Sequence, residues 1–335
     1  MNSNSIVLVF VFLLINLENS YSIIVQEEDT ASNIVTYHDD LNLKFILNTK
    51  YNNFIIDNEN LPGRIHWKTN DNNNIGIGGN YKWFGLNLLF NIPALNNDDE
   101  IYGNTTSFNL IGNIYTKKIG LDLFLQSTRG FYLESPETWN PGWTPEELYP
   151  HNSGLNFESL GANFLYVYDA DKYSLRSNFI LNERQLESAG SAILGSYFNI
   201  FSLSTDTSFI PFAPDTATEF ALDIREASYV NLGAFIGYSH TFIFEDYFFI
   251  SLTGALGIAI QGSNIITAND LYNNEDQQNI NGKFHLRAAV GYSNDIFFSS
   301  LSLIADNNRL GQSLNYNFGY ARLTFGYRIK LKKKA

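Results

Sequence analysis

The chain has 335 residues, of which 16% are charged and 15% are aromatic, and its formal net charge is −13. Few charges and many aromatic residues exclude an intrinsically disordered chain, and the acidic balance excludes nucleic acid as the main partner, because phosphate binding needs clustered Lys and Arg. The sequence contains no cysteine, which excludes disulfides, thiolate zinc sites and a cysteine nucleophile.

The first segment has the pattern of an export signal. Residues 6–15 form the apolar run IVLVFVFLLI, which matches a signal-peptide core and is too short to span a bilayer as a helix. Ser20 and Ser22 supply the small residues expected at a cleavage site, although the first five residues lack Lys and Arg. A buried first strand or helix is the alternative. We predict a signal peptide over residues 1–22, followed by a polar lead-in over 23–40.

The rest of the chain alternates apolar and polar residues with a period of two, which is the pattern of β-strands. In the segment 248–261, for example, Leu252 and Ile258 belong to an apolar face and Thr253 to the opposite face. The predicted strands, in chain order, are 42–56, 63–69, 75–81, 84–91, 104–116, 120–128, 157–168, 173–183, 190–204, 227–243, 248–261, 283–292, 295–305 and 314–330.

Two architectures bury one face of such strands. A soluble sandwich or lipocalin-like barrel turns its apolar face inward, whereas a transmembrane barrel turns it toward lipid. Many of the apolar faces repeat over about 9–13 residues, close to the length needed to cross a bilayer at a tilt. The opposite faces are rich in Ser, Thr, Asn, Gly and Ala, which suit a packed lumen. Aromatic residues gather around one turn, as expected of a membrane girdle; they are Tyr238, Phe242, Phe244, Tyr247 and Phe248.

We therefore predict an all-β fold: a transmembrane, antiparallel, up-and-down β-barrel of about 12–14 strands over residues 41–331, with a basic tail at 332–335. Its expected location is the bacterial outer membrane. Its expected partners are outer-membrane lipids, lipopolysaccharide and, during biogenesis, the barrel-insertion machinery.

Four short stretches carry a resemblance to a known family. They keep their order and spacing along the chain, and they are Tyr81–Leu86 (YKWFGL), Arg129–Glu134 (RGFYLE), Ser188–Ser191 (SAGS) and Phe325–Arg328 (FGYR). With them the sequence resembles a family of Gram-negative outer-membrane β-barrels that is classified as a domain of unknown function. The resemblance implies a barrel in the outer membrane, and it implies no reaction and no catalytic residues. Many outer-membrane barrels end on an aromatic residue, whereas this sequence continues beyond its last aromatic residues with Lys330 and a basic tail.

Two basic groups are the first candidate site. In each group, cations alternate with apolar or small residues and so share one strand face. If the apolar faces meet lipid, the cations point into the lumen and form an anion-selective constriction. The alternative is an internal network of ion pairs with Asp122, Glu158 and Glu183, which closes the barrel. The first group is Arg64, His66 and Lys68, and the second is Lys283, His285 and Arg287. Arg322 and Arg328 are two further basic residues that would add to the lumen charge.

The loop 135–154 is the second candidate site. It contains four of the eight prolines, which restrict the unfolded chain and favour an ordered loop. Trp139, Trp143 and Tyr149 would form a platform for a glycan or a partner protein, or they would pack against the barrel rim.

The sequence gives little support for catalysis or for a metal site. Ser188, Ser191 and Ser196 lack a G-x-S-x-G motif, and the five histidines are scattered without metal-ligand spacing. We expect no catalytic residue, no metal and no cofactor. The predicted function is a small pore or an envelope structural protein. The alternatives are a barrel enzyme acting on lipid or lipopolysaccharide, and a surface-binding barrel that uses the aromatic loop.

Overall fold

The computed structural model describes residues 33–57, 61, 63–70, 73–92, 98–209, 224–267, 279–310 and 314–331. The predicted signal peptide at 1–22 and the basic tail at 332–335 lie outside these residues. Within the described chain, no helix has the length and apolar character needed to span a bilayer.

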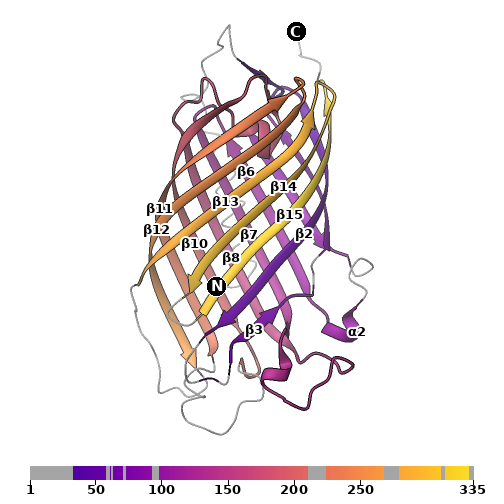
Figure 1. Ribbon diagram of the computed structural model, residues 1–335, viewed down its shortest axis with the longest axis vertical. Coiled ribbons are helices and arrows are strands. Elements are labelled where there is room, and N and C mark those ends of the chain that lie inside the picture. Colours follow the sequence, from indigo (N-terminus) through magenta and orange to yellow (C-terminus); the bar gives the residue numbers. More distant parts are fainter. Residues whose placement is uncertain are drawn as a thin grey trace. The chain divides into compact units, whose positions relative to one another are not determined.

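Twelve strands close into one antiparallel barrel, in which the first wall strand pairs with the last (Figure 1). This confirms the predicted all-β, up-and-down barrel. The wall strands are β2 (Leu41–Ile56), β4 (Asn73–Tyr81), β5 (Phe84–Asn91), β6 (Thr106–Tyr115), β7 (Ile119–Leu133), β8 (His151–Val167), β10 (Ala189–Ser204), β11 (Ile224–Phe244), β12 (Phe248–Thr267), β13 (Asn279–Ser293), β14 (Phe297–Leu310) and β15 (Leu314–Ile329).

Two of the predicted strands do not belong to the continuous wall. The segment 63–69 contains β3 (Ile65–Lys68), a short strand that joins β2 to β7 at one end of the barrel. The prediction of a strand at 173–183 is wrong: these residues form a π-helical turn, η4 (Arg176–Ile180), and then the start of β9 (Glu183–Gln185). Its apolar residues pack inside the barrel instead of alternating toward lipid.

The outer surface of the wall is apolar and the inner surface is polar. On β12, Leu252 is 50% exposed and Ile258 is 67% exposed, whereas Ser251 and Thr253 on the opposite face are buried. A soluble protein would not present such a face to water, but a bilayer accepts it, and a closed barrel leaves no unpaired strand edge in the lipid. The chain is therefore an outer-membrane β-barrel.

The two ends of the barrel differ. Short connections, such as residues 245–247 between β11 and β12, gather at one end, together with the start of β2 and the end of β15 (Figure 1). Exposed aromatic residues ring this turn end, among them Phe244, Tyr247, Phe248 and Tyr327. Most of the longer connections lie at the other, loop end, where η3 (Pro136–Thr138) and α2 (Asp99–Tyr102) are found, whereas the long connection between β8 and β10 lies at the turn end. In outer-membrane barrels the short turns face the periplasm and the longer loops face outward.

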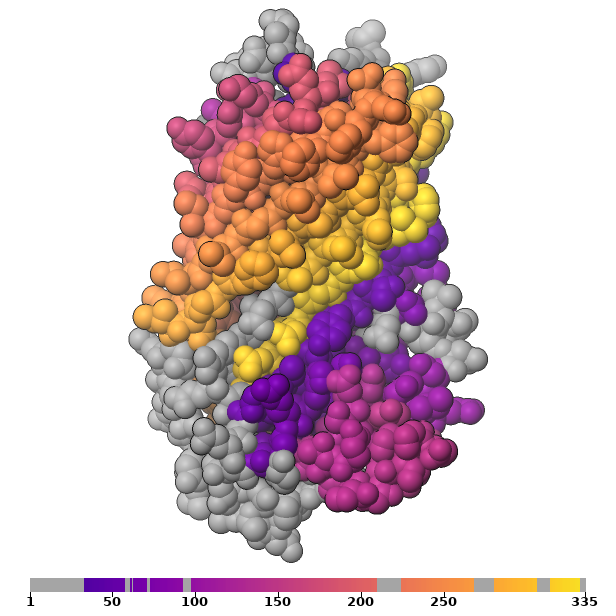
Figure 2. Space-filling model, in the orientation of Figure 1, coloured from indigo at the N-terminus to yellow at the C-terminus, as the bar shows by residue number. Residues whose placement is uncertain are grey.

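The strands cross the outer face obliquely, so that β11 to β15 and then β2 appear as successive diagonal bands (Figure 2). The loop-end segment around residues 134–150 forms a bulge beside β2 in the same view. The remaining short strand, β1 (Ile34–Thr36), pairs with β9 in a separate two-stranded sheet.

Candidate functional site: a lumen filled at both ends around a chamber

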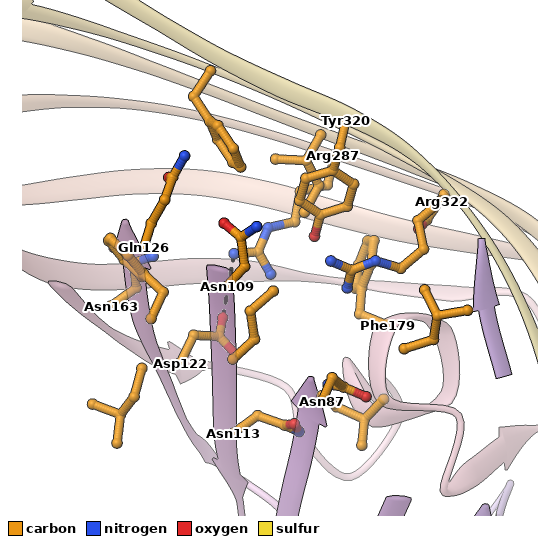
Figure 3. A pocket seen from close by; sticks show the side chains of 18 of the residues that line it. Asn87, Asn109, Asn113, Asp122, Gln126, Asn163, Phe179, Arg287, Tyr320 and Arg322 are labelled. Carbon is orange, nitrogen blue, oxygen red and sulfur yellow. Dashed lines mark hydrogen bonds and ion pairs between the residues drawn. The ribbon is translucent and has the colours of Figure 1, made fainter. Parts of the chain in front are cut away.

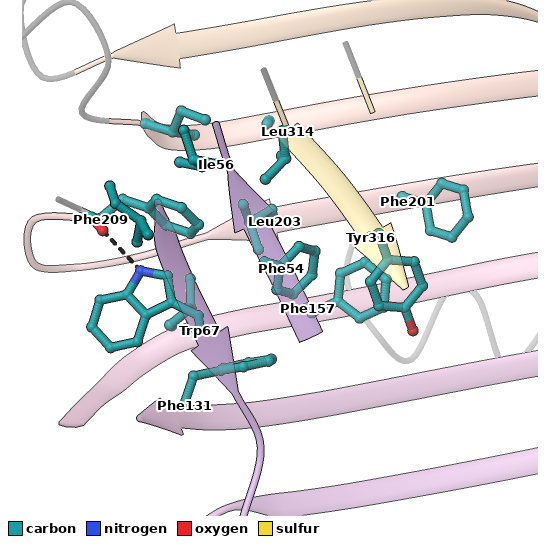
Figure 4. Packing of buried hydrophobic residues seen from close by; sticks show 14 of the residues in the cluster. Phe54, Ile56, Trp67, Phe131, Phe157, Phe201, Leu203, Phe209, Leu314 and Tyr316 are labelled. Carbon is teal, nitrogen blue, oxygen red and sulfur yellow. Dashed lines mark hydrogen bonds between the residues drawn. The ribbon is translucent and has the colours of Figure 1, made fainter. Parts of the chain in front are cut away.

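At the loop end, the inner faces of the strands are apolar and pack together across the lumen (Figure 4). The rings of Phe54, Phe157 and Tyr316 come from three different strands, and their centroids lie 4.6–5.1 Å apart. The Trp67 indole packs beside them, and its N–H donates to the Phe209 carbonyl oxygen at 2.9 Å. We call this cluster the apolar seal; its buried members are Phe54, Ile56, Leu61, Ile65, Trp67, Phe131, Leu133, Leu155, Phe157, Phe201, Leu203, Phe209, Ile224, Ala227, Tyr229, Leu314 and Tyr316.

Two local features of the backbone build the seal. The strands β4 to β6 do not extend to the loop end, where β3 alone bridges β2 and β7. Because fewer strands surround the lumen there, the barrel is narrow enough for side chains to fill it. A bulge in β7 lies at Gly130, whose φ of 90° is in the left-handed region that glycine favours. The bulge resets the alternation of β7, so that Phe131 and Leu133 both point inward.

At the turn end, the connection between β8 and β10 folds back into the lumen. We call residues 168–188 the plug. Tyr173 is fully buried, and its hydroxyl hydrogen-bonds to that of Ser239 on the inner face of β11. The amide of Asn178 donates to the Thr241 hydroxyl at 2.6 Å. These polar contacts account for the hydroxyl-bearing residues Ser239 and Thr241 on the inner face of β11.

Buried charges hold the plug to the wall. Arg176 pairs with Glu183 at 2.6 Å within the plug, and it also donates to the carbonyl oxygen of Tyr115 on β6. From the end of β15, Arg328 donates to the carbonyl oxygen of Leu181. The Arg328 guanidinium also lies over the ring of Tyr37, 4.0 Å from its centroid. Burial and a hydrogen bond to Asp295 raise the pKa of Tyr37 to about 12, so this phenol stays protonated.

Between the seal and the plug lies a chamber of about 170 Å³ (Figure 3). Strands from both halves of the barrel line it, and Phe179 and Ile180 of the plug form its floor. Its polar lining consists largely of side-chain amides, and its charged lining residues are Lys44, Asp122, Lys283, Arg287 and Arg322. Among the described lining residues, four cations thus face one carboxylate.

The chamber charges fall into two groups. Arg287 donates to Asp122 at 3.3 Å, and the Tyr115 hydroxyl donates to the same carboxylate at 3.0 Å, so this acid is already satisfied. On the other side, Arg322 lies 4.2 Å from the centroid of the Tyr320 ring, and its Nε donates to the Asn48 side chain. Figure 3 shows Arg322, Tyr320 and Phe179 converging on this side of the chamber.

The second basic group lies on the inner face of β13. His285 and Arg287 are buried, and Arg287 Nε donates to His285 Nε2 at 2.6 Å. The Lys283 ammonium lies 4.0 Å from the centroid of the Tyr197 ring. The structure therefore brings these three residues to the chamber and its margin, together with Asp122.

The first basic group does not face the lumen, which corrects the sequence prediction. Arg64 precedes β3 and pairs with Asp57, and both side chains are mostly exposed. On β3, His66 and Lys68 pair with Glu134 on the outer side of the wall. The reason is that Ile65 and Trp67, which alternate with them, belong to the apolar seal. Apolar strand faces point toward lipid in the membrane band, but at this end of the barrel they point into the lumen. Glu158, which follows the inward-facing Phe157, also lies on the outer face.

The aromatic loop is ordered by its own contacts. Trp139 packs against the apolar seal. Trp143 and Tyr149 are edge-to-face with centroids 4.9 Å apart, and the Trp143 indole donates to the Leu148 carbonyl oxygen. The Tyr149 ring also lies 4.7 Å from that of Tyr102 on α2. One of the three predicted contact residues thus supports the seal, and two form a cluster on the barrel surface.

Two of the three serines considered for catalysis have backbone partners. The Ser188 hydroxyl accepts a hydrogen bond from the Ile243 N–H, and the Ser191 hydroxyl accepts one from the Asp169 N–H. His240, on the neighbouring strand, packs against the ring of Phe242. Within the described residues, no group of three or more His, Asp or Glu side chains is placed to hold a metal ion.

Sequence reasoning missed Lys44 as a chamber residue. The signal was present, because Lys44 alternates with the outward-facing Leu43 and Phe45. A lysine on the polar face of a membrane strand points into the lumen, and this criterion finds Lys44 without a structure.

The chain was also compared with known proteins. By fold, the chain is similar to the beta domain of the Bordetella autotransporter Brka, with 10% identity and a TM-score of 0.39, covering 86% of this chain and 99% of that one. It is also similar to the P. putida toluene transporter TodX (10% identity, TM-score 0.30, 88% and 91% covered) and to OmpT of Vibrio cholerae (9% identity, TM-score 0.29, 90% and 100% covered). The comparison with curated protein sequences found no match.

The sequence motifs that suggested a family lie around the plug and the seal. The turn Lys82–Trp83 accepts a hydrogen bond from Asn182 of the plug, and Arg328 reaches the plug from the opposite side. The motif at 129–134 contains the β7 bulge and Phe131 of the seal. A family model described as "Domain of unknown function (DUF4421)" matches residues 27–329. The chain belongs to the DUF4421 family.

Proposed function

We propose that the protein is a closed outer-membrane barrel that does not conduct ions, and that it serves the envelope as a structural or binding protein and not as an open pore. The observation that carries this proposal is that, within the described residues, the lumen is filled at both ends. The apolar seal occupies the loop end, and the plug occupies the turn end.

The two barriers differ in their chemistry. Water and ions pass the apolar seal only if large buried rings such as Phe54 and Phe157 separate, which exposes apolar surface at about 25 cal/mol per Å². They pass the plug only if buried charge-assisted hydrogen bonds break, such as those of Arg176 and Arg328. Leaving such groups unpaired in a buried site costs several kcal/mol. Because the barriers lie in series, either one is enough to block the lumen.

Single-channel recording in planar bilayers tests the proposal. Three variants accompany the wild type: one with the seal weakened (Phe54→Ser and Phe157→Ser), one with the plug weakened (Arg176→Ser and Arg328→Ser), and one with all four changes. We expect no steady current from the wild type or from either partial variant, and current only when both barriers are weakened. Gel mobility before and after heating checks that each variant is folded. A steady open-channel current from the wild type would contradict the proposal.

We infer that the surroundings of this barrel are outer-membrane lipids, lipopolysaccharide at the loop end, and the insertion machinery during biogenesis. The outward apolar band and the aromatic turn end support the lipid contacts. Phe325 and Tyr327 on the outer face of β15 supply the aromatic end of a barrel that the insertion machinery would recognise. No catalytic role is proposed for Ser188 or Ser191, whose hydroxyls accept backbone hydrogen bonds.

A further inference from the structure

Two of the cations that line the chamber, Lys44 and Arg322, have no acidic partner among the described residues. Lys44 is buried on the inner face of β2, and it has no hydrogen-bond or ion-pair partner among the described residues. Arg322, on the neighbouring strand β15, bonds to the neutral Asn48 side chain and stacks on Tyr320. The one carboxylate that lines the chamber, Asp122, already accepts hydrogen bonds from Arg287 and Tyr115. The Lys44 side of the chamber is therefore left with uncompensated positive charge.

Such an arrangement is unfavourable when the chamber holds only water. Buried cations repel each other, and the positive charges of Arg322 and Arg328 are close enough to repel that of Lys44. Burial of a charge is costly unless an opposite charge and hydrogen bonds compensate it. A carboxylate between Lys44 and Arg322 supplies both, because charge-assisted hydrogen bonds to Arg and Lys are among the strongest in proteins.

The rest of the lining suits an organic molecule and not a bare ion. Tyr320 and Phe179 present aromatic surface beside Arg322 (Figure 3). Ile111 and Phe124 also line the chamber. Lumen amides supply polar partners, and the side-chain oxygen of Asn87 is buried without a hydrogen bond among the described residues. Ligand sites typically combine such an apolar lining with a few polar groups that fix the orientation of the ligand.

The volume sets the size of the ligand. An engineered protein cavity of about 150 Å³ holds one benzene molecule. The chamber, with about 170 Å³, therefore accepts a single six-membered ring with a small substituent.

We propose that the chamber binds a small organic carboxylate of about one ring in size, with its carboxylate between Lys44 and Arg322 and its body against Tyr320 and Phe179. This inference rests on the proposed closed barrel, because the plug and the seal form the floor and the roof of the chamber. It gives the closed lumen a ligand class that neither the family nor the fold supplies.

Folding in the presence of probes tests this inference without requiring entry through the closed ends. Benzoate, benzamide and inorganic phosphate are each present while the mature chain folds from urea into detergent micelles. The concentration dependence of the thermal unfolding midpoint then gives an apparent Kd, since a ligand that binds only the folded state stabilises it. We expect benzoate to bind at least about tenfold more tightly than benzamide, which lacks the charge, and than phosphate, which lacks the ring.

Variants locate the site. Lys44→Met and Arg322→Gln should each weaken benzoate binding about tenfold or more, because each removes one charge contact. Lys50→Met is the matched control: Lys50 lies on the same inner face of β2 but outside the chamber, where it donates to Ser107. This control should bind benzoate as the wild type does.

The outcomes separate this inference from the proposed function. A wild type that does not conduct and shows no benzoate-dependent shift overturns the ligand inference alone. Equal affinity for benzoate and benzamide, or equal loss in the Lys50 control, also overturns it. A wild type that conducts steadily overturns the closed barrel, whatever the binding result.

Discussion

The Nη2 atom of Arg328 donates to the carbonyl oxygen of Leu181 at 2.9 Å, which joins the last wall strand to the plug. The same guanidinium donates to the Ser293 hydroxyl and to backbone carbonyl oxygens of the turn between β13 and β14. Its face lies over Tyr37, which precedes the first wall strand. One planar side chain thus connects the lead-in, the plug and the closing strand, a role for which Lys lacks both the fork of donors and the flat face.

Replacing Arg328 by Lys should lower the free energy of unfolding by about 3 kcal/mol, because several charge-assisted hydrogen bonds are lost in a buried site. The change is measured from unfolding in urea, followed by tryptophan fluorescence. Arg64→Lys is the control. Arg64 is mostly exposed beside Asp57, and such surface changes stay within about 0.5 kcal/mol. Similar losses in the two variants would show that Arg328 does not hold the plug.

The pair of Asp122 and Arg287 should behave as a coupled unit. Asp122→Asn and Arg287→Met should each cost about 3–5 kcal/mol, because each leaves a buried charge without its partner. The double variant should cost clearly less than the sum of the two single changes. Strict additivity in the double-mutant cycle would mean that this ion pair does not stabilise the barrel.

Adjacent positions on β14 test the orientation of the wall. Ser302 lines the chamber and pairs with Arg322 across the strands, whereas Leu303 is 51% exposed on the outer face. Leu303→Glu should cost about 1–2 kcal/mol, because the carboxylate enters lipid and Glu is penalised less than Arg there. Ser302→Glu should cost less, since its carboxylate meets Arg322. The reverse order would contradict the assignment of the two faces.

Much of the barrel could be predicted from alternation alone. On β12, Leu252 and Thr253 were assigned to opposite faces from the sequence, and the structure places them so, because a strand in a bilayer has one lipid face and one lumen face along its whole length. Twelve of the fourteen predicted segments became the wall. The period of two is a local property, and it survives folding wherever the surroundings of the strand stay uniform.

The two exceptions depend on surroundings that the local sequence does not specify. The segment around Tyr173 alternates weakly, but its fold is decided by contacts with Ser239 and Thr241, which are far along the chain. In β3, alternation correctly separated Trp67 from Lys68, yet it gave no information on which face points inward. Outside the membrane band the apolar face turns inward, as in a soluble protein. The chamber was therefore predicted only in part: Arg287 was found, and Lys44 was not.

The central claim, a lumen closed at both ends, is tested most directly by the reactivity of a single cysteine inside it. The chain has no cysteine, so Ser302→Cys places one thiol at the chamber and Leu148→Cys places one on the loop end, where Leu148 is 71% exposed. Both variants are treated with a charged, membrane-impermeant thiol reagent, in the folded state and after unfolding in urea.

We predict that the folded chamber thiol reacts at least about 100-fold more slowly than the loop thiol, because access requires an opening that costs about 3 kcal/mol or more. After unfolding, the two rates should be alike. Rates within about threefold of each other in the folded barrel would contradict a closed lumen.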